Sequence, residues 1–365
     1  MKGIGFVGCG NISGIYLSNI SNMFNNLRTV GVTDLIHERS EYAASQYGIG
    51  KIYKDMHELF ADPEVDIVLN ITRPYEHFDV SIAALNAGKH LYTEKPLGAS
   101  LEEAEKIMAL ATEKNLYVGG APDTFLGAGI QTCRKLIDDG YIGEVFGASA
   151  YMVNRGHEHW HPDPEFYYKY GGGPMMDMGP YYLTALISLL GAVDSVTGMS
   201  KISLPERTIS SQPHYGAVIT VDVPTYVTGI MRFTSGAIGT IFTTFDVHTA
   251  QVPCIEIYGS KGTLCVPDPN YHGGPVRLYT ESTGCFKEIP LMFDYSENCR
   301  SLGLADMAIA IETGIKARAS GEMQLHVNEI MDGFERADRE QRFIKLKYST
   351  TRPEPMIAKS NGCQG

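Results

Sequence analysis

The chain has 365 residues, which is long for one domain and suits two. Apolar residues make up 44% of the sequence and charged residues 20%, as in globular proteins with a substantial core. The formal net charge is −12, and the lysines and arginines are dispersed rather than clustered. We therefore expect no nucleic-acid partner and no membrane partner, because both need a basic surface.

Membrane and export signals are not visible in the sequence. No apolar run reaches the roughly 18–20 residues that a membrane helix needs. Met1–Val7 has the pattern of a buried strand rather than of a signal peptide. The seven cysteines lie far apart and form no C-x-x-C pair, as expected for reduced thiols. We therefore expect a cytoplasmic protein.

Short apolar runs alternate with helical patterns in the first third of the chain. The expected strands are Gly3–Gly8, Val30–Asp34, Ile67–Thr72, His90–Glu94 and Leu116–Gly120, with helical spacing at Glu76–Ala87 and Leu101–Lys114. Strands that are apolar on both faces and alternate with helices indicate a parallel sheet covered on both sides. The sequence therefore predicts a doubly wound α/β domain of the Rossmann type over residues 1–124.

A different pattern follows Gly143, where β-branched and aromatic segments are joined by short turns. We expect strands at Val145–Val153, Ala217–Val223, Tyr226–Phe233, Ile238–Val247 and Cys254–Tyr258, and helices at 180–190, 302–313 and 325–341. These elements predict an α+β domain over residues 125–348 with a large, open, mainly antiparallel sheet. A helix at 127–140 would close the first domain and bridge to this sheet, and residues 349–365 would form a surface arm or tail.

The outer face of the expected sheet has no second helical layer to cover it. An open sheet face of this kind is buried most simply against another copy of itself. We therefore expect a homo-oligomer that associates through the C-terminal sheet.

The segment Gly8-Cys9-Gly10-Asn11-Ile12-Ser13 follows the first expected strand and begins a helix. Gly8 permits a tight turn, Gly10 lets the backbone approach a pyrophosphate, and the helix N-terminus favours the negative charge. Asp34 ends the second strand, where a carboxylate accepts hydrogen bonds from ribose hydroxyls and repels a 2′-phosphate. The pattern therefore predicts NAD and disfavours NADP, and Arg39 is the one nearby residue that would soften this preference.

Lys95 follows a buried strand and precedes Pro96. Ligands of open α/β sheets bind beyond the carboxyl ends of the strands, so Lys95 is placed where a nicotinamide and a substrate hydroxyl can meet. Pro96 restricts Lys95 to extended geometry and can form a cis peptide bond, and either would fix the direction of the lysine. A solvated loop lysine is the alternative interpretation.

Several separated motifs occur in one order along the chain. They are the glycine turn with Asp34, the segment Ile71–His77, Glu94-Lys95-Pro96, the segment Gly171–Tyr181, the segment Tyr258–Thr263 and the late segment Gly303–Asp306. In this order they resemble the Gfo/Idh/MocA family, which includes glucose–fructose oxidoreductase and inositol dehydrogenase. The resemblance covers nearly the whole chain and implies a Rossmann domain followed by an open antiparallel sheet.

The resemblance also implies roles for residues of the first domain. Lys95 would bind the substrate hydroxyl and tune the proton acceptor. The segment from Thr72 to His77 would lie along the ribose and nicotinamide, although Tyr75 stands where the family usually has Asn. The expected cofactor-binding set is therefore Gly8, Gly10, Asn11, Ile12, Asp34, Thr72, Arg73, Tyr75, His77, Glu94 and Lys95.

The acid/base pair departs from the usual family pattern of an Asp and a His four residues apart. This chain has Asp177 and Tyr181, and glucose–fructose oxidoreductase similarly uses a tyrosine. Four residues make one helical turn, and Pro180 suits a first turn, so both side chains can face the same way. We expect Tyr181 to transfer the proton, with the Lys95 ammonium favouring its phenolate. Asp177 would orient the substrate or hold Lys95 charged, and a Tyr181 that only packs in a helix interface is the alternative.

A histidine-rich segment spans residues 157–161. If it is extended, its three histidines point to one side with a spacing that suits zinc, but hydride transfer needs no metal and we expect none. We expect instead a polar and aromatic wall over a sugar-like substrate, and a purely structural role is the alternative. The expected substrate-binding set is Asp123, Asn154, His157, His159, Trp160 and Asp177, with Thr124, Arg155, Tyr167 and Tyr168 as further candidates.

These features predict an NAD-dependent dehydrogenase for a secondary hydroxyl of a sugar, inositol or glycoside. The stretch at 119–126 and the tyrosine variant resemble bacterial members that act on glycosides, which favours C3 of a pyranoside, such as a flavonoid C-glucoside. Two other functions stay open, a glycosidase that oxidises its substrate transiently with bound NAD and a non-catalytic cofactor-sensing regulator. The retained Lys95, Asp177 and Tyr181 argue against the regulator.

Overall fold

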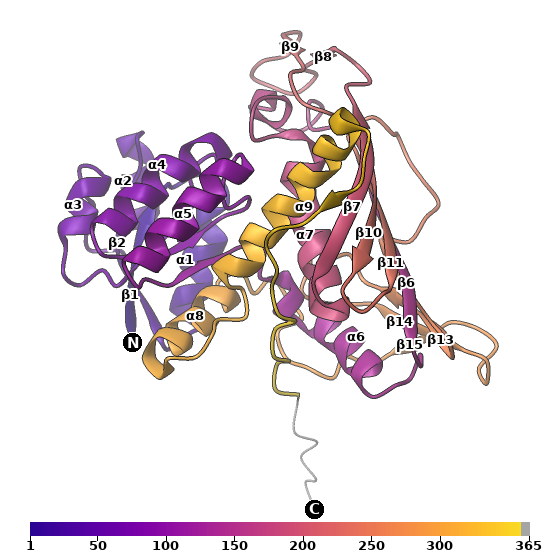
Figure 1. Ribbon diagram of the computed structural model, residues 1–365. Helices are drawn as coiled ribbons and strands as arrows, with labels where there is room; N and C mark the ends of the chain where they lie inside the picture. The colour runs from indigo at the N-terminus through magenta and orange to yellow at the C-terminus, as the bar shows by residue number, and fades with distance from the viewer. Residues whose placement is uncertain (359–365) are drawn as a thin grey trace, which may run out of the picture. The chain divides into compact units, whose positions relative to one another are not determined.

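The structure, a computed structural model, describes residues 1–358 and divides into two units (Figure 1). The first unit comprises Met1–Asp123 and Arg300–Glu329, and the second comprises Thr124–Cys299 and the chain from Ile330 onward. The sequence led us to expect residues 300–329 in the second domain, but Ser320 pairs with Gly119 at the edge of the first sheet. Residues 359–365, the end of the expected tail with Cys363, lie outside the described residues.

The sheet of the first unit is the one that the apolar runs predict. Its strands are β1 (Lys2–Val7), β2 (Leu27–Thr33), β3 (Ile67–Asn70), β4 (His90–Thr93) and β5 (Val118–Gly120). All neighbouring strands are parallel, and their spatial order is β2-β1-β3-β4-β5. The order reverses between β1 and β3, which is where open α/β sheets bind ligands beyond the carboxyl ends of their strands.

Helices connect the parallel strands of this unit. They are α1 (Ser13–Asn22), α2 (His37–Tyr47), α3 (Met56–Ala61), α4 (His77–Asn86) and α5 (Leu101–Glu113), with the short 3-10 turn η1 (Pro74–Glu76) before α4. A later helix, α8 (Leu302–Thr313), belongs to the same unit but connects none of these strands. Because β1 connects to β2 in one direction and β3 to β4 in the other, right-handed crossovers place helices on both faces, as predicted. The sequence pattern did not reveal α2, which buries only small side chains, or α3, which has 6 residues.

The second unit contains the large open sheet that the sequence predicts. Its nine strands are β6 (Val145–Val153), β7 (Val193–Lys201), β10 (Tyr226–Phe233), β11 (Ile238–Thr244), β12 (Ile255–Gly259), β13 (Gly262–Val266), β14 (Val276–Thr280), β15 (Lys287–Ile289) and β16 (Ile344–Lys345). Only the β6–β11 pair is parallel among these neighbours, so the sheet is mainly antiparallel. The strand expected at 217–223 is shorter and belongs elsewhere: β9 (Val218–Thr220) pairs with β8 (Glu206–Thr208) in a separate two-stranded sheet.

Helices pack on one face of the large sheet (Figure 1). They are α6 (Ala128–Asp138), α7 (Gly173–Leu190) and the second half of α9 (Gly321–Glu340), and short 3-10 turns precede α6 (η2, Thr124–Leu126) and α7 (η3, Glu165–Tyr168). α6 belongs to the second unit, as the expected bounds 125–348 imply, and it does not close the first domain. α7 begins at Gly173 with Pro174 in its first turn, so Pro180 lies inside the helix and cannot donate to the carbonyl of Met176.

Two glycines of the large sheet make room for Phe334 of α9. Gly198 of β7 and Gly229 of β10 are direct partners in the register of the sheet. A Cβ at Gly229 would lie 2.2 Å from the ring of Phe334, and one at Gly198 would lie 3.1 Å from its Cβ. Phe334 is completely buried, so its ring packs directly against the backbone of the sheet.

Residues 349–358 form neither helix nor strand, but they are bound to the second unit. Arg352 Nε donates to the carbonyl oxygen of Ser188 in α7 at 2.9 Å. Arg134 Nη1 of α6 donates to the carbonyl oxygen of Pro353 at 2.8 Å, and the N–H of Met356 donates to Gln131 Oε1 at 2.8 Å. The described part of the expected arm is therefore attached along α6 and the end of α7.

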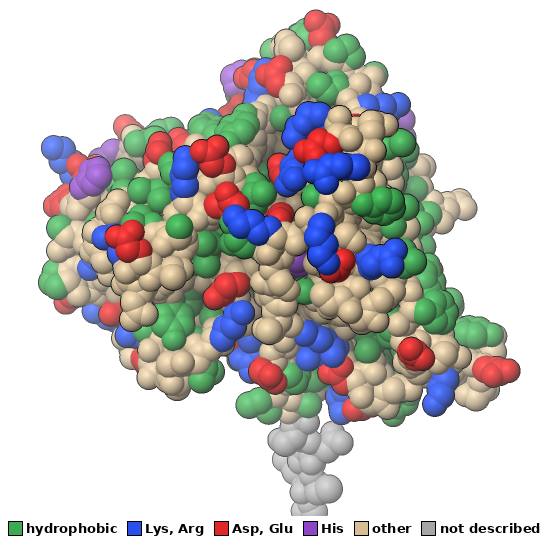
Figure 2. Space-filling view, in the orientation of Figure 1, with side chains coloured by type: hydrophobic (Ala, Val, Ile, Leu, Met, Phe, Trp, Pro, Cys, Tyr) green, Lys and Arg blue, Asp and Glu red, His purple; other side chains and the backbone are tan. Residues whose placement is uncertain are grey.

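The surface charges follow the dispersed pattern of the sequence. Figure 2 shows Lys and Arg side chains interspersed with Asp and Glu on one face. Lys106 with Glu102 and Lys135 with Asp139 are ion pairs one helical turn apart, a kind of contact that stabilises little at the surface. Among residues 1–358, no helix is long and apolar enough to cross a membrane.

The other face of the large sheet carries exposed apolar side chains. Buried and exposed residues alternate along β10 and β11, because successive side chains of a strand point to opposite faces. The exposed set includes Met199, Ile230 and Ile238, which are 65%, 47% and 51% exposed. An open, partly apolar sheet face of this kind suits association with a second sheet.

We expect Gly229→Ala to lower the free energy of unfolding by about 1–3 kcal/mol, because the added methyl group overlaps the ring of Phe334. Urea or thermal unfolding of the purified variant measures this change. Gly50→Ala is the matched control, since nothing lies within 4 Å of a Cβ at Gly50. The control should change stability by less than about 0.5 kcal/mol, and equal losses in the two variants would contradict the packing argument.

We also expect the protein to self-associate through the exposed sheet face at micromolar concentration. Ile230→Lys should shift sedimentation velocity profiles towards smaller species, because a buried lysine opposes the contact. Ile315→Lys is the control, since Ile315 is 54% exposed in the first unit. A wild-type protein that sediments as a monomer would refute this expectation.

Candidate active site

The glycine turn after β1 combines close packing with an open position. Gly8 has a φ of +103°, which favours glycine, and a Cβ there would lie 2.8 Å from the carbonyl oxygen of Ile71. Nothing lies within 4 Å of a Cβ at Gly10. The hydroxyl and N–H of Ser13 both donate to the Gly10 carbonyl, at 2.7 and 3.0 Å, where α1 begins. The turn therefore has room at Gly10 for a pyrophosphate beside a helix N-terminus, and it fits a dinucleotide.

The carboxylate of Asp34 joins the glycine turn to the end of β2. One oxygen accepts the N–H of Cys9 at 2.7 Å, and the other accepts the N–H of Ile36 at 2.8 Å. Each carboxylate oxygen has a further lone pair, so this geometry is compatible with hydrogen bonds from ribose hydroxyls. Burial raises the pKa of the Cys9 thiol to about 11, so this cysteine stays neutral beneath the turn. Asn11 and Arg39 are exposed, and Ile12 is half-buried.

Asn70, which the sequence analysis did not single out, holds the loop after β3. Its Oδ1 accepts the hydroxyl of Thr72 at 2.7 Å, and its Nδ2 donates to the carbonyl of His77 at 3.0 Å. Arg73 and Tyr75 lie at the exposed side of the loop, where Arg73 Nη1 donates to the Tyr75 hydroxyl at 2.8 Å. The loop that was expected to line the cofactor is thus fixed from within the unit.

His77 is buried and contacts two carbonyl groups. Its Nδ1 lies 2.8 Å from the carbonyl oxygen of Pro96, and its Nε2 lies 3.1 Å from that of Thr72. Burial lowers the pKa of His77, although both carbonyls oppose this effect. The ring ties the loop after β3 to the Lys95-Pro96 step, which favours a positioning role over the expected direct contact with the cofactor.

Lys95 lies directly after β4, and its peptide bond to Pro96 is cis. Its N–H donates to Glu94 Oε2 at 3.1 Å, while the hydroxyl of Tyr16 donates to Glu94 Oε1 at 2.7 Å. Burial, together with the neighbouring Glu94 carboxylate, raises the pKa of Tyr16 well above its ordinary value, so Tyr16 remains a donor. Glu94 is only 9% exposed and fixes the backbone that carries Lys95.

Asp123, which we expected to bind the substrate, is buried in the first unit. Its side chain is 1% exposed, and its Oδ2 accepts the N–H of Gly303 at 2.9 Å in the first turn of α8. A carboxylate is stabilising at a helix N-terminus, where unpaired N–H groups concentrate. This hydrogen bond gives Asp123 a structural role in the first unit, and the expected substrate contact stays a prediction. Thr124 is also 1% exposed.

In the second unit, α7 carries Asp177 and Tyr181 one helical turn apart, as the spacing predicts. His157 lies beside this helix, with its Nε2 3.7 Å from Oδ2 of Asp177. The side chains of His157 and Asp177 are 8% and 13% exposed, and Tyr181 is 6% exposed. The structure thus brings His157 and Asp177 into contact, although they are distant in the sequence.

The histidine-rich segment is a turn rather than an extended strand. The N–H groups of Trp160 and His161 both donate to the carbonyl of His157, at 3.2 and 3.0 Å. His157 is buried, whereas His159 is exposed and Trp160 is 57% exposed. The histidines therefore do not line one side of a strand, and the spacing argument for zinc does not apply. Asn154 Oδ1 accepts the N–H of Gly156 at 2.8 Å and so closes the chain before the turn.

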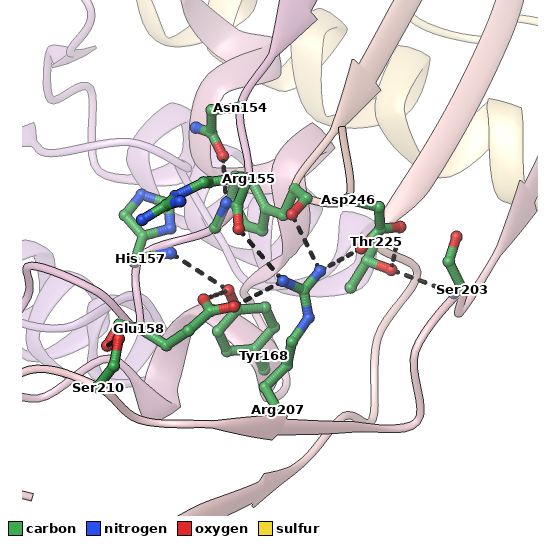
Figure 3. A network of polar contacts seen from close by, with 12 residues as sticks. Asn154, Arg155, His157, Glu158, Tyr168, Ser203, Arg207, Ser210, Thr225 and Asp246 are labelled. Atoms are coloured by element: carbon green, nitrogen blue, oxygen red, sulfur yellow. Dashed lines mark hydrogen bonds and ion pairs between the residues drawn. The ribbon is translucent and has the colours of Figure 1, made fainter. Parts of the chain in front are cut away.

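A buried network of charges fixes this turn (Figure 3). Arg207 donates to Glu158 Oε1 at 2.6 Å and to the carbonyl of Phe245 at 2.9 Å, and it also pairs with Asp246. Tyr168 donates its hydroxyl to the other oxygen of Glu158. Desolvation opposes ionisation, yet the tyrosine and arginine hold the pKa of Glu158 below its ordinary value.

Two charged residues of this network, Arg207 and Asp246, were missed in the sequence. Arg207 and Asp246 lie 49 and 88 residues beyond Glu158 and carry no local motif. They line a pocket of about 390 Å³ beside the turn, which also includes Arg155, Glu158, His159, Leu204, Glu206, Thr208, Ser210 and His248. A pocket of this size is large enough for a sugar ring.

Two family models match the chain. Residues 2–120 match the oxidoreductase family with an NAD-binding Rossmann fold, and residues 130–265 match the GFO/IDH/MocA C-terminal domain. The fold and the glycine turn define an NAD-binding oxidoreductase with a Rossmann unit and a large mixed sheet. Both models describe one family and together match well over half of the chain, so this chain belongs to the Gfo/Idh/MocA family.

Relatives with assigned activities are similar at moderate identity. The myo-inositol 2-dehydrogenase of Thermotoga maritima is 25% identical over 72% of this chain and 74% of that protein. The levoglucosan dehydrogenase of Pseudarthrobacter phenanthrenivorans is 25% identical over 62% of each chain, so less than two thirds of that relative is matched. A solved structure of levoglucosan dehydrogenase with NADH and levoglucosan has a TM-score of 0.80 at 20% identity, covering 94% of this chain and 99% of that one. This structural likeness confirms the fold.

We expect Gly10→Ala to weaken NAD binding at least about tenfold, or about 1.4 kcal/mol, because the methyl group occupies the space that the pyrophosphate needs. Titration calorimetry with NAD measures the loss. Thermal unfolding of the free variant should stay close to wild type, since the space around Gly10 is open.

Gly8→Ala provides the contrast, because its positive φ and its contact with Ile71 predict a loss of stability. Unchanged NAD binding in Gly10→Ala would show that the phosphates lie elsewhere.

Proposed function

We propose that this chain is an NAD-dependent dehydrogenase that removes hydride from a secondary hydroxyl-bearing carbon of a sugar or glycoside. C3 of a pyranoside is the favoured carbon, and a flavonoid C-glucoside is the favoured substrate. The observation that carries the proposal is the presence, in one chain, of the open dinucleotide turn at Gly10 and of an acid/base helix with Asp177 and Tyr181 one turn apart.

The named activities of the relatives support a polyhydroxylated substrate. Their names specify myo-inositol and levoglucosan, both of which are rings that carry several secondary hydroxyls. The substrate of this chain is proposed by analogy with that shared chemistry. The preference for a glycoside rests on the tyrosine at 181 and on the stretch at 119–126, which resemble members that act on glycosides.

The residues that would hold NAD belong to the first unit. Gly10 and the N-terminus of α1 would take the pyrophosphate, and Asp34 would take the adenosine ribose and repel a 2′-phosphate. When bound, the nicotinamide accepts the hydride that leaves the substrate carbon. Thr72, Arg73 and Tyr75 stay in the proposed cofactor set, while His77 and Glu94 would act by fixing the loops around it.

The substrate hydroxyl also loses a proton, and Tyr181 is proposed to accept it. A free tyrosine has a pKa of about 10, which makes it a poor base at neutral pH unless positive charge favours its phenolate. Lys95 is proposed to supply that charge as an ammonium group. Asp177 would orient the substrate or keep Lys95 charged.

The histidine-rich turn is proposed to contribute to substrate binding. Exposed Trp160 offers an aromatic face on which a sugar ring or an aglycone can stack, and exposed His159 offers a polar group at the adjoining pocket. Oxidation at C3 of a glycoside would acidify the neighbouring C–H bond, so that a partner enzyme could eliminate the aglycone. The cytoplasmic location and the homo-oligomer remain part of this proposal.

A panel of free sugars, inositols and glycosides with NAD tests the activity through the absorbance of the reduced nicotinamide. On the best substrate, Lys95→Met and Tyr181→Phe should each lower kcat at least about 100-fold, because each removes a group that promotes proton transfer. NAD binding to Tyr181→Phe should persist in calorimetry.

The matched controls are Tyr182→Phe, one position along α7, and Lys106→Met at the surface, both of which should retain activity. Release of free aglycone without net NAD reduction would favour the glycosidase instead. NAD binding with no turnover of any compound would favour the regulator.

A further inference from the structure

The contact between His157 and Asp177 points to a role for His157 other than substrate binding. Nε2 of His157 lies 3.7 Å from Oδ2 of Asp177, and both side chains are largely buried. At this separation a protonated imidazole attracts the carboxylate, and limited solvent strengthens the attraction. Asp177 lies one turn before Tyr181 on α7, so a group that fixes Asp177 also fixes the surroundings of the proposed proton acceptor.

Aromatic packing sets the plane of the His157 ring. The ring stacks on Tyr167 with centroids 3.7 Å apart and planes within 5° of parallel. The ring of Phe245 meets it edge-on at 4.7 Å and 81°. A ring held on its face and at its edge cannot turn freely, so the direction of Nε2 towards Asp177 is set by packing.

The backbone of His157 is fixed as well. Its N–H donates to the hydroxyl of Tyr168 at 3.3 Å, and its carbonyl accepts from the two N–H groups that close the turn. The next residue, Glu158, is held by Arg207 and Tyr168 in the buried network (Figure 3). The carbonyl of Glu158 also accepts the N–H groups of Ser210 and Ser211 at 2.8 and 3.0 Å.

We propose that His157 is a positioning residue for the reaction, which orients the Asp177 carboxylate through Nε2. Among the described residues, the titratable or charged groups in contact with His157 include Asp177 of α7 and Tyr167 of η3, with Tyr168, Glu158 and His161 at the backbone of the turn. The kinetic part of this proposal rests on the proposed function. The pairing of His157 with Asp177 does not rest on the proposed function, and it has a test of its own.

Nitrogen NMR of the full-length protein, labelled at its 11 histidines, tests the pairing without any substrate. The His157 resonances are those that disappear in His157→Phe. Asp177→Asn should shift them, because the carboxylate that faces Nε2 becomes a neutral amide. Asp222→Asn is the matched control, since Asp222 pairs with Lys169 in the same unit, and it should leave them in place. Unchanged His157 resonances in Asp177→Asn would overturn the proposal.

Kinetics on the best substrate of the panel then separate positioning from substrate binding. His157→Phe keeps a ring against Tyr167 but removes Nε2, and it should lower kcat at least about tenfold with KM changed less than about threefold. His157→Gln restores an N–H donor and should recover part of the loss, and it also replaces His157→Phe if that variant does not fold. The double variant His157→Phe with Asp177→Asn should be no slower than Asp177→Asn alone, because coupled residues are not additive.

A raised KM with unchanged kcat would assign His157 to substrate binding and overturn the proposal. Additive losses in the double variant would also overturn it, because they would show that the two residues act independently. If no compound in the panel turns over, the proposed function fails, and the NMR comparison still decides whether His157 is coupled to Asp177.

Discussion

Three polar side chains at the carboxyl ends of β2, β3 and β4 accept hydrogen bonds that fix the neighbouring loops of the first unit. Asp34 follows β2 and accepts the N–H of Cys9, Asn70 ends β3 and accepts the hydroxyl of Thr72, and Glu94 follows β4 and accepts the N–H of Lys95. A buried polar group without a partner is costly, so each acceptor restricts the loop beside it. The open space at Gly10 and the direction of the chain at Lys95 both depend on these hydrogen bonds.

In the second unit, the ion pairs of Arg207 with Glu158 and Asp246 fix the turn at residues 157–161. Arg207 is 6% exposed, and it is stable there because Glu158 and Asp246 supply carboxylates and Phe245 supplies a carbonyl. Removal of one partner from such a cluster leaves a buried charge, which is far more destabilising than the loss of an exposed pair. The turn that presents His157 and Trp160 is therefore held by charges that lie far apart in the sequence and meet only in the folded unit.

Local signals explain which parts of the molecule the sequence could predict. The strands β6 and β10 have the predicted bounds because alternation is encoded within each segment. The glycine turn, Lys95 and the Asp177–Tyr181 spacing are likewise contained within a few residues. We expected α7 to begin at Pro180, because proline suits the first turn of a helix and is rare inside one. The proline in the first turn is instead Pro174, and Pro180 lies inside the helix.

Contacts between distant residues explain what the sequence could not predict. No periodicity relates Glu158 to Arg207, or His157 to Asp177, since each pair is in contact only in the folded unit. The contact that Asp123 makes was not predicted for the same reason, because its partner Gly303 lies 180 residues further along the chain. Pattern alone identified candidate residues for the proposed chemistry, and the fold shows which of them hold a loop.

A tyrosine at position 181 acts as a base only if its neighbours stabilise the anion, which a histidine at this position would not require. A neutral tyrosine becomes an anion when it gives up its proton, and a carboxylate one helical turn away opposes that change. Asp177 occupies that position, so the charge of Asp177 has to be balanced for Tyr181 to act as a base. Nε2 of His157 faces Oδ2 of Asp177, and the imidazole would provide such a balance when it is protonated. The buried network that fixes His157 would then serve the proton transfer proposed for Tyr181, although none of its members lies on α7.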